Sequence, residues 1–129
     1  MQYPEKNLKN LLSGLIKKAQ KQRVSLNNFD VRFLAITLGK SYILKVPVIH
    51  LPIKKIFKAN INFQNKNEIK TIDLELKKLF KKLEPLTYPY KRKDGTIMTV
   101  PIFRNIFLKN FQIYIFIEKA FFHLFLYEI

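Results

Sequence analysis

The sequence predicts an α+β fold with two amphipathic helices and a long β-hairpin that extends as an arm. Three observations support this prediction. Residues 4–21 and 67–83 repeat apolar side chains at helical spacing. Residues 84–113 place Asp94-Gly95 between two β-prone runs, a strong hairpin signal. Residues 111–129 are rich in Ile, Phe and Tyr, which favour strands.

The first predicted helix covers residues 4–21. Pro4 and Glu5 suit a first helical turn. The apolar stripe consists of Leu8, Leu11, Leu12, Leu15, Ile16 and Ala19. Lysines, among them Lys17 and Lys18, fall largely outside this stripe. They suit either a solvated face or a surface that contacts phosphates.

Residues 24–53 carry a more ambiguous pattern, with two predicted extended runs. Apolar and polar side chains alternate over 29–35, which indicates a strand. The sequence Gly-Lys-Ser at 39–41 predicts a turn before a second extended run, 42–49. Pro47 and Pro52 interrupt this second run, so we expect an edge strand or an extended crossing segment, because proline cannot donate a hydrogen bond to a neighbouring strand.

The second predicted helix, 67–83, follows a short predicted strand at 58–63. Asn65 or Asn67 is its candidate N-cap, and Pro85 ends it. Its outward lysines are candidates for RNA binding: Lys77, Lys78, Lys81 and Lys82.

The stretch 84–113 is the predicted arm. Pro89 fits an edge strand or an extended arm. Further candidates for RNA contact along it are Tyr88, Tyr90, Lys91, Arg92, Lys93, Arg104 and Lys109. The two tyrosines suit stacking on unpaired bases, contacts with proteins or packing within the hairpin. The part from 100 to 108 is largely apolar, which indicates contacts with neighbouring proteins. The candidates for those contacts are Phe103, Ile106, Phe107 and Leu108.

Residues 111–129 are predicted to form one long strand, because Ile113, Ile115 and Ile117 recur at period two. The alternative is a transmembrane helix, which would make the protein a small anchored subunit of a membrane complex. Glu118 and Lys119 lie near the centre of this segment, where each charge would cost roughly 2.5–3.5 kcal/mol. The strand is therefore favoured.

Charge is the strongest indication of function. Twenty-four basic residues against nine acidic ones give a formal net charge of +15, which favours a polyanionic partner, with nucleic acid ahead of an anionic membrane. Only four of the basic residues are Arg, which together with abundant Ile, Asn and Phe is typical of an A+T-rich coding sequence. An organelle genome, above all a mitochondrial one, fits this bias, and an A+T-rich nuclear or bacterial genome would give the same composition. The N-terminus shows no signal-peptide pattern, as expected for synthesis within the organelle.

No constellation for catalysis is recognisable. The chain has no Cys, and His50 and His123 lie far apart in apolar runs typical of core or interface histidines. Asp73 and Glu75 are two residues apart on a predicted helix and so point to different faces. A phosphate-binding loop at 39–41 would need Gly where Leu34 stands. We expect neither an enzyme nor a metal or cofactor site.

The stretch 84–113 resembles the hairpin of the small-subunit ribosomal protein ten family, which sits in the head of the small ribosomal subunit. That hairpin reads Gly-Pro-Ile-Pro-Leu-Pro-Thr-Lys, a basic link, Thr-Val-Leu-Arg-Ser-Pro-His-Val, a second link and Gln-Phe-Glu-Ile. The identical positions are Pro85, Pro89, Lys91, Thr96, Pro101, Phe111 and Ile113. The order strand, helix, hairpin extends the resemblance over roughly 55–127. Thr99-Val100 replaces the family's Arg-Ser before the second proline.

The resemblance implies a ferredoxin-like sheet with two helices on one face, with a core at 55–129 and an extension at 1–54 that packs on it as one domain. The family adds a helix and a strand after the hairpin; the helix at 4–21 and a strand within 29–49 are expected to take their places. Implied partners are small-subunit rRNA and head proteins three, nine and fourteen, in a mitochondrial ribosome. A second resemblance, to ribosomal protein seven, rests on Pro85, Leu86, Arg92, Gly95 and Val100-Pro101. It needs a gap and implies a mostly helical protein.

Overall fold

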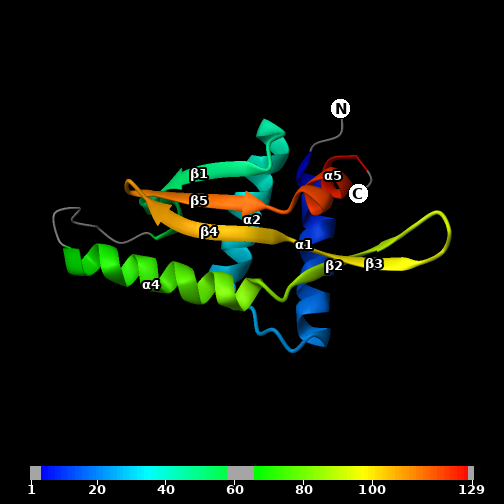
Figure 1. Ribbon diagram of the computed structural model, residues 1–129, viewed down its shortest axis with the longest axis horizontal. Helices are drawn as coiled ribbons and strands as arrows, with labels where there is room; N and C mark the ends of the chain where they lie inside the picture. Colours follow the sequence, from blue (N-terminus) through cyan, green and yellow to red (C-terminus); the bar gives the residue numbers. More distant parts are fainter. Residues whose placement is uncertain (1–3, 58–65, 128–129) are drawn as a thin grey trace.

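The computed structural model describes residues 4–57 and 66–127 and has an α+β fold (Figure 1). The helices are α1 (Pro4–Lys21), α2 (Asn28–Leu44), α3 (Ile53–Ile56), α4 (Lys66–Leu83) and α5 (Lys119–Tyr127). The strands are β1 (Val48–Pro52), β2 (Thr87–Lys91), β3 (Ile97–Pro101), β4 (Phe103–Lys109) and β5 (Gln112–Ile117). The strand expected at 58–63 and the candidate cap Asn65 lie outside the described residues.

The main sheet is antiparallel, with strand order β1-β5-β4. Side chains alternate in burial along β5, so that Ile113, Ile115 and Ile117 face the core. Ile49 of β1 and Ile106 of β4 lie opposite Ile115 and continue this buried face. Among the described residues β1, which includes Pro52, lies at an edge of this sheet, in agreement with one of the two expectations for this run.

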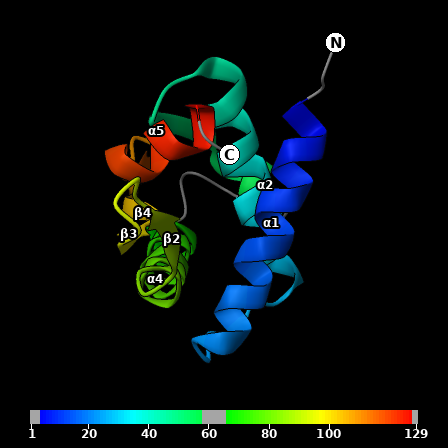
Figure 2. The same ribbon diagram turned by 90° about the vertical axis from the view of Figure 1, so that its right-hand side faces the viewer.

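Helices cover the buried face of this sheet. α2 packs against β1, α4 packs against β4, and α1 packs against α2 (Figures 1 and 2). Phe33 of α2 meets Phe103 of β4 with ring centroids 6.0 Å apart. One core cluster contains buried residues from α1 through α5, so the described parts of 1–54 and 55–129 contribute to a single core.

The hairpin β2–β3 forms a separate two-stranded sheet. Its turn is at Asp94-Gly95, as predicted: the Asp94 Oδ1 atom accepts hydrogen bonds from Thr96 N at 2.9 Å and Thr96 Oγ1 at 2.6 Å. Gly95 has φ +90°, a backbone conformation that favours glycine. Leu86, just before β2, and Ile102, just after β3, are fully buried and anchor the base of the hairpin to the core.

The predicted strand at 29–35 and the predicted turn at 39–41 are wrong, because both segments belong to α2. Asn27 and Asp30 form a capping box that starts this helix. Its buried residues are Asp30, Phe33, Leu34, Thr37, Leu38 and Ser41, which follow helical spacing. The helix is apolar on most sides, so its sequence also satisfies an alternating pattern. Of the second run, 42–49, only Val48 and Ile49 are in a strand.

The single long strand predicted over 111–129 is also wrong. β5 ends at Ile117, and α5 follows, with Phe121, Leu124 and Phe125 buried at helical spacing. The predicted arm is shorter than 84–113, since β4 pairs with β5 in the main sheet and only β2–β3 projects.

The helix at 4–21, α1, was expected to pack on the sheet beside α4. Instead α2 packs on the sheet there, and α1 packs on α2 (Figure 2). Helix α1 therefore supports the sheet indirectly, through α2. Both predicted helices are confirmed: 4–21 is helical, and 67–83 lies within α4.

Candidate nucleic-acid interface

The β2–β3 hairpin carries an exposed group of cations among the predicted RNA-binding residues. It projects beyond the helices and the main sheet (Figure 1). Lys91, Arg92 and Lys93 are consecutive and exposed at its tip. The backbone there is fixed by hydrogen bonds from Arg92 N to Thr96 O at 2.8 Å and from Gly95 N to Arg92 O at 3.0 Å. The tip thus presents three positive charges on an ordered turn.

The base of the hairpin contacts α1. Lys18 Nζ lies 5.0 Å from the centroid of the Tyr88 ring, and Gln22 donates a hydrogen bond to Thr87 Oγ1 at 3.0 Å. Partial burial, followed by repulsion from Lys21, lowers the pKa of the Lys18 ammonium group. Lys18 therefore braces the hairpin as well as adding charge beside it. Lys17 is exposed on the same helix.

The two tyrosines of β2 pack against the protein itself. The ring of Tyr88 meets that of Phe121 edge-on, with centroids 5.8 Å apart. Tyr90 is half-buried and lines an open hollow of about 440 Å³ between the hairpin and α5. The other residues of this hollow are Arg92, Met98, Val100, Ala120, His123 and Leu124.

Of the four candidate lysines on α4, three are exposed: Lys77, Lys78 and Lys81. Lys77 and Lys78 are exposed and form surface ion pairs with Asp73 at 3.0 Å and Glu75 at 3.7 Å. Pairs of this kind contribute little to stability and exchange readily for another anion. Lys81 is exposed in the last turn of the helix, close to the start of the hairpin.

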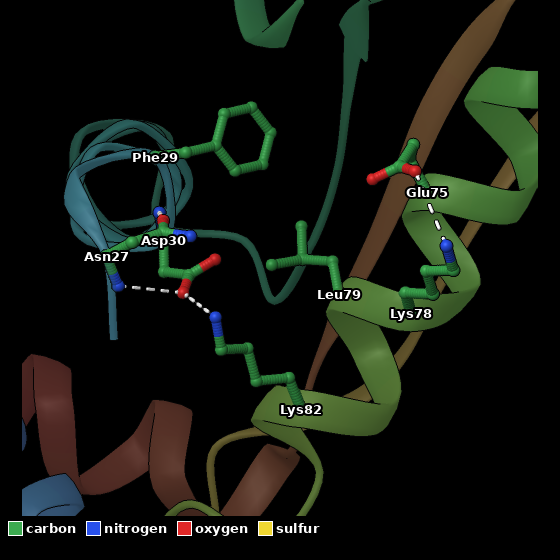
Figure 3. A pocket seen from close by; sticks show the side chains of 7 residues that line it. All are labelled: Asn27, Phe29, Asp30, Glu75, Lys78, Leu79 and Lys82. Carbon is green, nitrogen blue, oxygen red and sulfur yellow. Dashed lines mark hydrogen bonds and ion pairs between the residues drawn. The ribbon is translucent and has the colours of Figure 1, made fainter. Parts of the chain in front are cut away.

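Lys82 differs from the other lysines because it bridges two helices (Figure 3). Its Nζ atom lies 2.5 Å from Asp30 Oδ2 at the start of α2. The Asp30 side chain is 3% exposed, and the same oxygen accepts a hydrogen bond from Asn27 N at 3.0 Å. The ammonium group of Lys82 thus compensates a buried carboxylate, and we leave Lys82 out of the proposed RNA surface.

Arg104 and Lys109 lie on β4 in the main sheet and not on the arm. Both are exposed. Among the residues expected to contact neighbouring proteins, Phe103 and Ile106 are buried in the core and are not available to a partner. Leu108 is half-buried and packs against that core. Phe107 alone of this group lies on the outer side of the sheet.

The outer side of the main sheet carries functional candidates that the sequence interpretation missed. We name as the open sheet face Val48, His50, Asn105, Phe107, Tyr114 and Phe116, which lie opposite one another in the register of β1, β5 and β4. The strand positions between them point into the core. The sequence did contain a sign of this face. Gln112, Tyr114 and Phe116 alternate with Ile113, Ile115 and Ile117, so they lie on the opposite side of the strand from the isoleucines.

Within the described ranges, 4–57 and 66–127, no cluster of three or more potential metal ligands is present. In the same ranges no helix is long and apolar enough to cross a membrane.

At the hairpin turn, hydrogen bonds from the Thr96 side chain and backbone lower the pKa of Asp94 below its ordinary value.

A comparison with known proteins finds no matching family, no matching curated protein and no matching solved structure. The functional assignment therefore depends on the chain's own residues. They form an α+β domain with a strongly basic balance and a projecting cationic hairpin.

Proposed function

We propose that this protein is a structural RNA-binding component of a mitochondrial small ribosomal subunit, of the ribosomal protein ten type and encoded within the organelle. The observation that carries the proposal is the projecting β2–β3 hairpin with consecutive cations at 91–93. Such a tip neutralises phosphates without reading base sequence, as a structural ribosomal protein requires.

The charge balance supports a polyanionic partner for the whole molecule. Of the nine acidic residues, Asp30, Asp73 and Glu75 pair with lysines, and Asp94 is used in the hairpin turn. Nine acidic residues can neutralise at most nine of the 24 cations of the chain. Self-repulsion on this scale is relieved when phosphates bind.

The order of elements is compatible with the ribosomal protein ten resemblance. The helix α4 leads into the hairpin, and α5 follows β5 at the position where that family adds a helix. This arrangement also removes the need for α1 to supply the later helix. The expected partners are small-subunit rRNA and the neighbouring head proteins three, nine and fourteen.

Gradient sedimentation of a mitochondrial lysate tests the proposal. The protein, detected by an antibody, should migrate with small ribosomal subunits and shift to the top of the gradient after RNase treatment. It should remain with the subunits after detergent extraction of the membranes. Sedimentation away from the subunits before RNase treatment, or recovery with lipid until detergent is added, would overturn the proposal.

A further inference from the structure

The open sheet face displays a continuous row of aromatic rings across all three strands of the main sheet. The rings of Phe107 and Tyr114 are nearly parallel, at 12°, with centroids 5.5 Å apart. Phe116 lies 5.6 Å from Phe107 at 20°, and His50 lies 5.7 Å from Tyr114. Phe107, Tyr114 and Phe116 are half-buried and His50 is exposed. Helices α1 and α2 lie on the other side of the sheet (Figures 1 and 2).

Polar and cationic groups surround these rings. Arg104, Asn105, Phe107 and Phe116 line an open hollow of about 360 Å³ at one end of the row. A bulge in β4 between Phe103 and Asn105 leaves Arg104 without a partner position on β5, and Arg104 is exposed there. The Asn105 Oδ1 atom accepts a hydrogen bond from Ile106 N at 2.9 Å, so the amide NH₂ group is the donor that this side chain offers to a ligand.

The charge of this face selects among possible occupants. The sequences of β1, β4 and β5 contain no Asp or Glu, while Arg104 and Lys109 contribute positive charge. An apolar partner helix would not require the arginine, the amide and the imidazole that accompany the rings. Unpaired nucleotides match all of them: the base stacks on a ring, the phosphate pairs with a cation, and the base edge bonds to an amide.

We propose that the open sheet face binds single-stranded RNA by stacking unpaired bases on Phe107, Tyr114 and Phe116, with Arg104 holding a phosphate. This inference deepens the proposed RNA-binding function and depends on it. It assigns two modes to the protein: the hairpin tip binds backbone phosphates, and the sheet binds bases. The two modes predict different responses to the removal of bases from the RNA.

Three fluorescent probes separate these modes in anisotropy titrations of the whole protein. They are a single-stranded oligouridylate of about 12 nucleotides, an abasic ribose-phosphate strand of the same length, and a blunt RNA duplex. We expect Phe107→Leu and Tyr114→Leu each to weaken binding of the oligouridylate by roughly 5- to 150-fold. Binding of the abasic strand and of the duplex should change by less than about twofold, since phosphate contacts remain.

Matched variants control for folding. Phe29→Leu removes a half-buried ring of α2 that pairs with Phe57 at 5.5 Å, away from the open sheet face, and should leave binding of all three probes unchanged. Phe107→Tyr and Tyr114→Phe keep a ring at each position and should retain binding of the oligouridylate. NMR of the unmodified protein adds a test free of substitutions: the ring protons of Phe107 and Tyr114 should shift upfield with the oligouridylate and not with the abasic strand.

Three results would overturn the stacking proposal alone: equal affinity of the unmodified protein for all three probes, wild-type binding by folded Phe107→Leu and Tyr114→Leu, or a dimer that buries this face. A protein that binds none of the probes would instead overturn the proposed RNA-binding function itself.

Discussion

Replacement of Lys82 with Met tests how α4 is held against α2. Methionine keeps most of the aliphatic length of lysine, so the change removes the ammonium group while largely preserving packing. That ammonium group is 2.5 Å from the Asp30 carboxylate, whose side chain is 3% exposed. The variant therefore leaves a buried charge without its cation.

The expected loss follows from the surroundings of the pair. Removing one partner of a fully buried ion pair costs about 3–5 kcal/mol. Two features reduce this cost: the Lys82 side chain is 32% exposed, so water can reach the site, and Asp30 keeps the hydrogen bond from Asn27 N at 3.0 Å. We expect the free energy of unfolding to fall by about 2–3 kcal/mol. For a chain of this size, the fall in Tm is roughly 6–15 °C.

Urea and thermal unfolding followed by circular dichroism measure this loss. Lys81→Met is the matched control, because Lys81 is an exposed neighbour on the same helix, and its stability should stay within about 0.5 kcal/mol of the unmodified protein. A double-mutant cycle with Asp30→Asn, which retains an oxygen for the cap, should give a coupling of about 1–2 kcal/mol. A coupling near zero, or Lys82→Met as stable as the control, would refute this account of the helix contact.

The other predictions concern the hairpin. Substituting Gln at all three positions 91–93 should reduce the slope of log affinity against log salt by about 2–3 with an RNA ligand, with Tm unchanged; an unaltered slope would remove the tip from the interface. Gly95→Ala should destabilise the hairpin by roughly 1 kcal/mol, because φ is +90° although no atom crowds the added Cβ, and amide exchange over 87–101 would report it. The lowered pKa of Asp94 means that its contribution to the turn is present above its ordinary pKa of 3.8 and lost as pH falls through the folded-state value. A carboxyl titration by NMR that gives 3.8 or higher for Asp94 would contradict this.

Local sequence patterns were sufficient to predict the elements whose apolar residues recur at a regular spacing or whose turn residues are distinctive. The stripe of α4 and the Asp94-Gly95 turn define their structures within the stretch itself, and both are confirmed. The capping box of Asn27 and Asp30 was also visible in the sequence. It was overlooked because apolar residues occupy ten of the 17 positions of α2, so that alternation and helical spacing fit the same residues.

Contacts between residues far apart in the chain could not be predicted from local sequence patterns. The pattern of β5 shows which of its residues share a side, but nothing local states that Tyr114 lies opposite both His50 and Phe107. For the same reason Lys82 looked like another surface cation, since its partner Asp30 is 52 residues away. The end of the chain misled for a different reason: Ile and Phe are β-formers, and burial of Phe121 and Phe125 against the core overrides that preference.

Ultraviolet crosslinking within isolated small ribosomal subunits, with the crosslinked peptides identified by mass spectrometry, tests the central claim most directly. The account predicts rRNA crosslinks on the peptide that contains residues 87–101, the projecting hairpin. Absence of the protein from the subunits, or rRNA crosslinks confined to peptides outside residues 87–101, would contradict it.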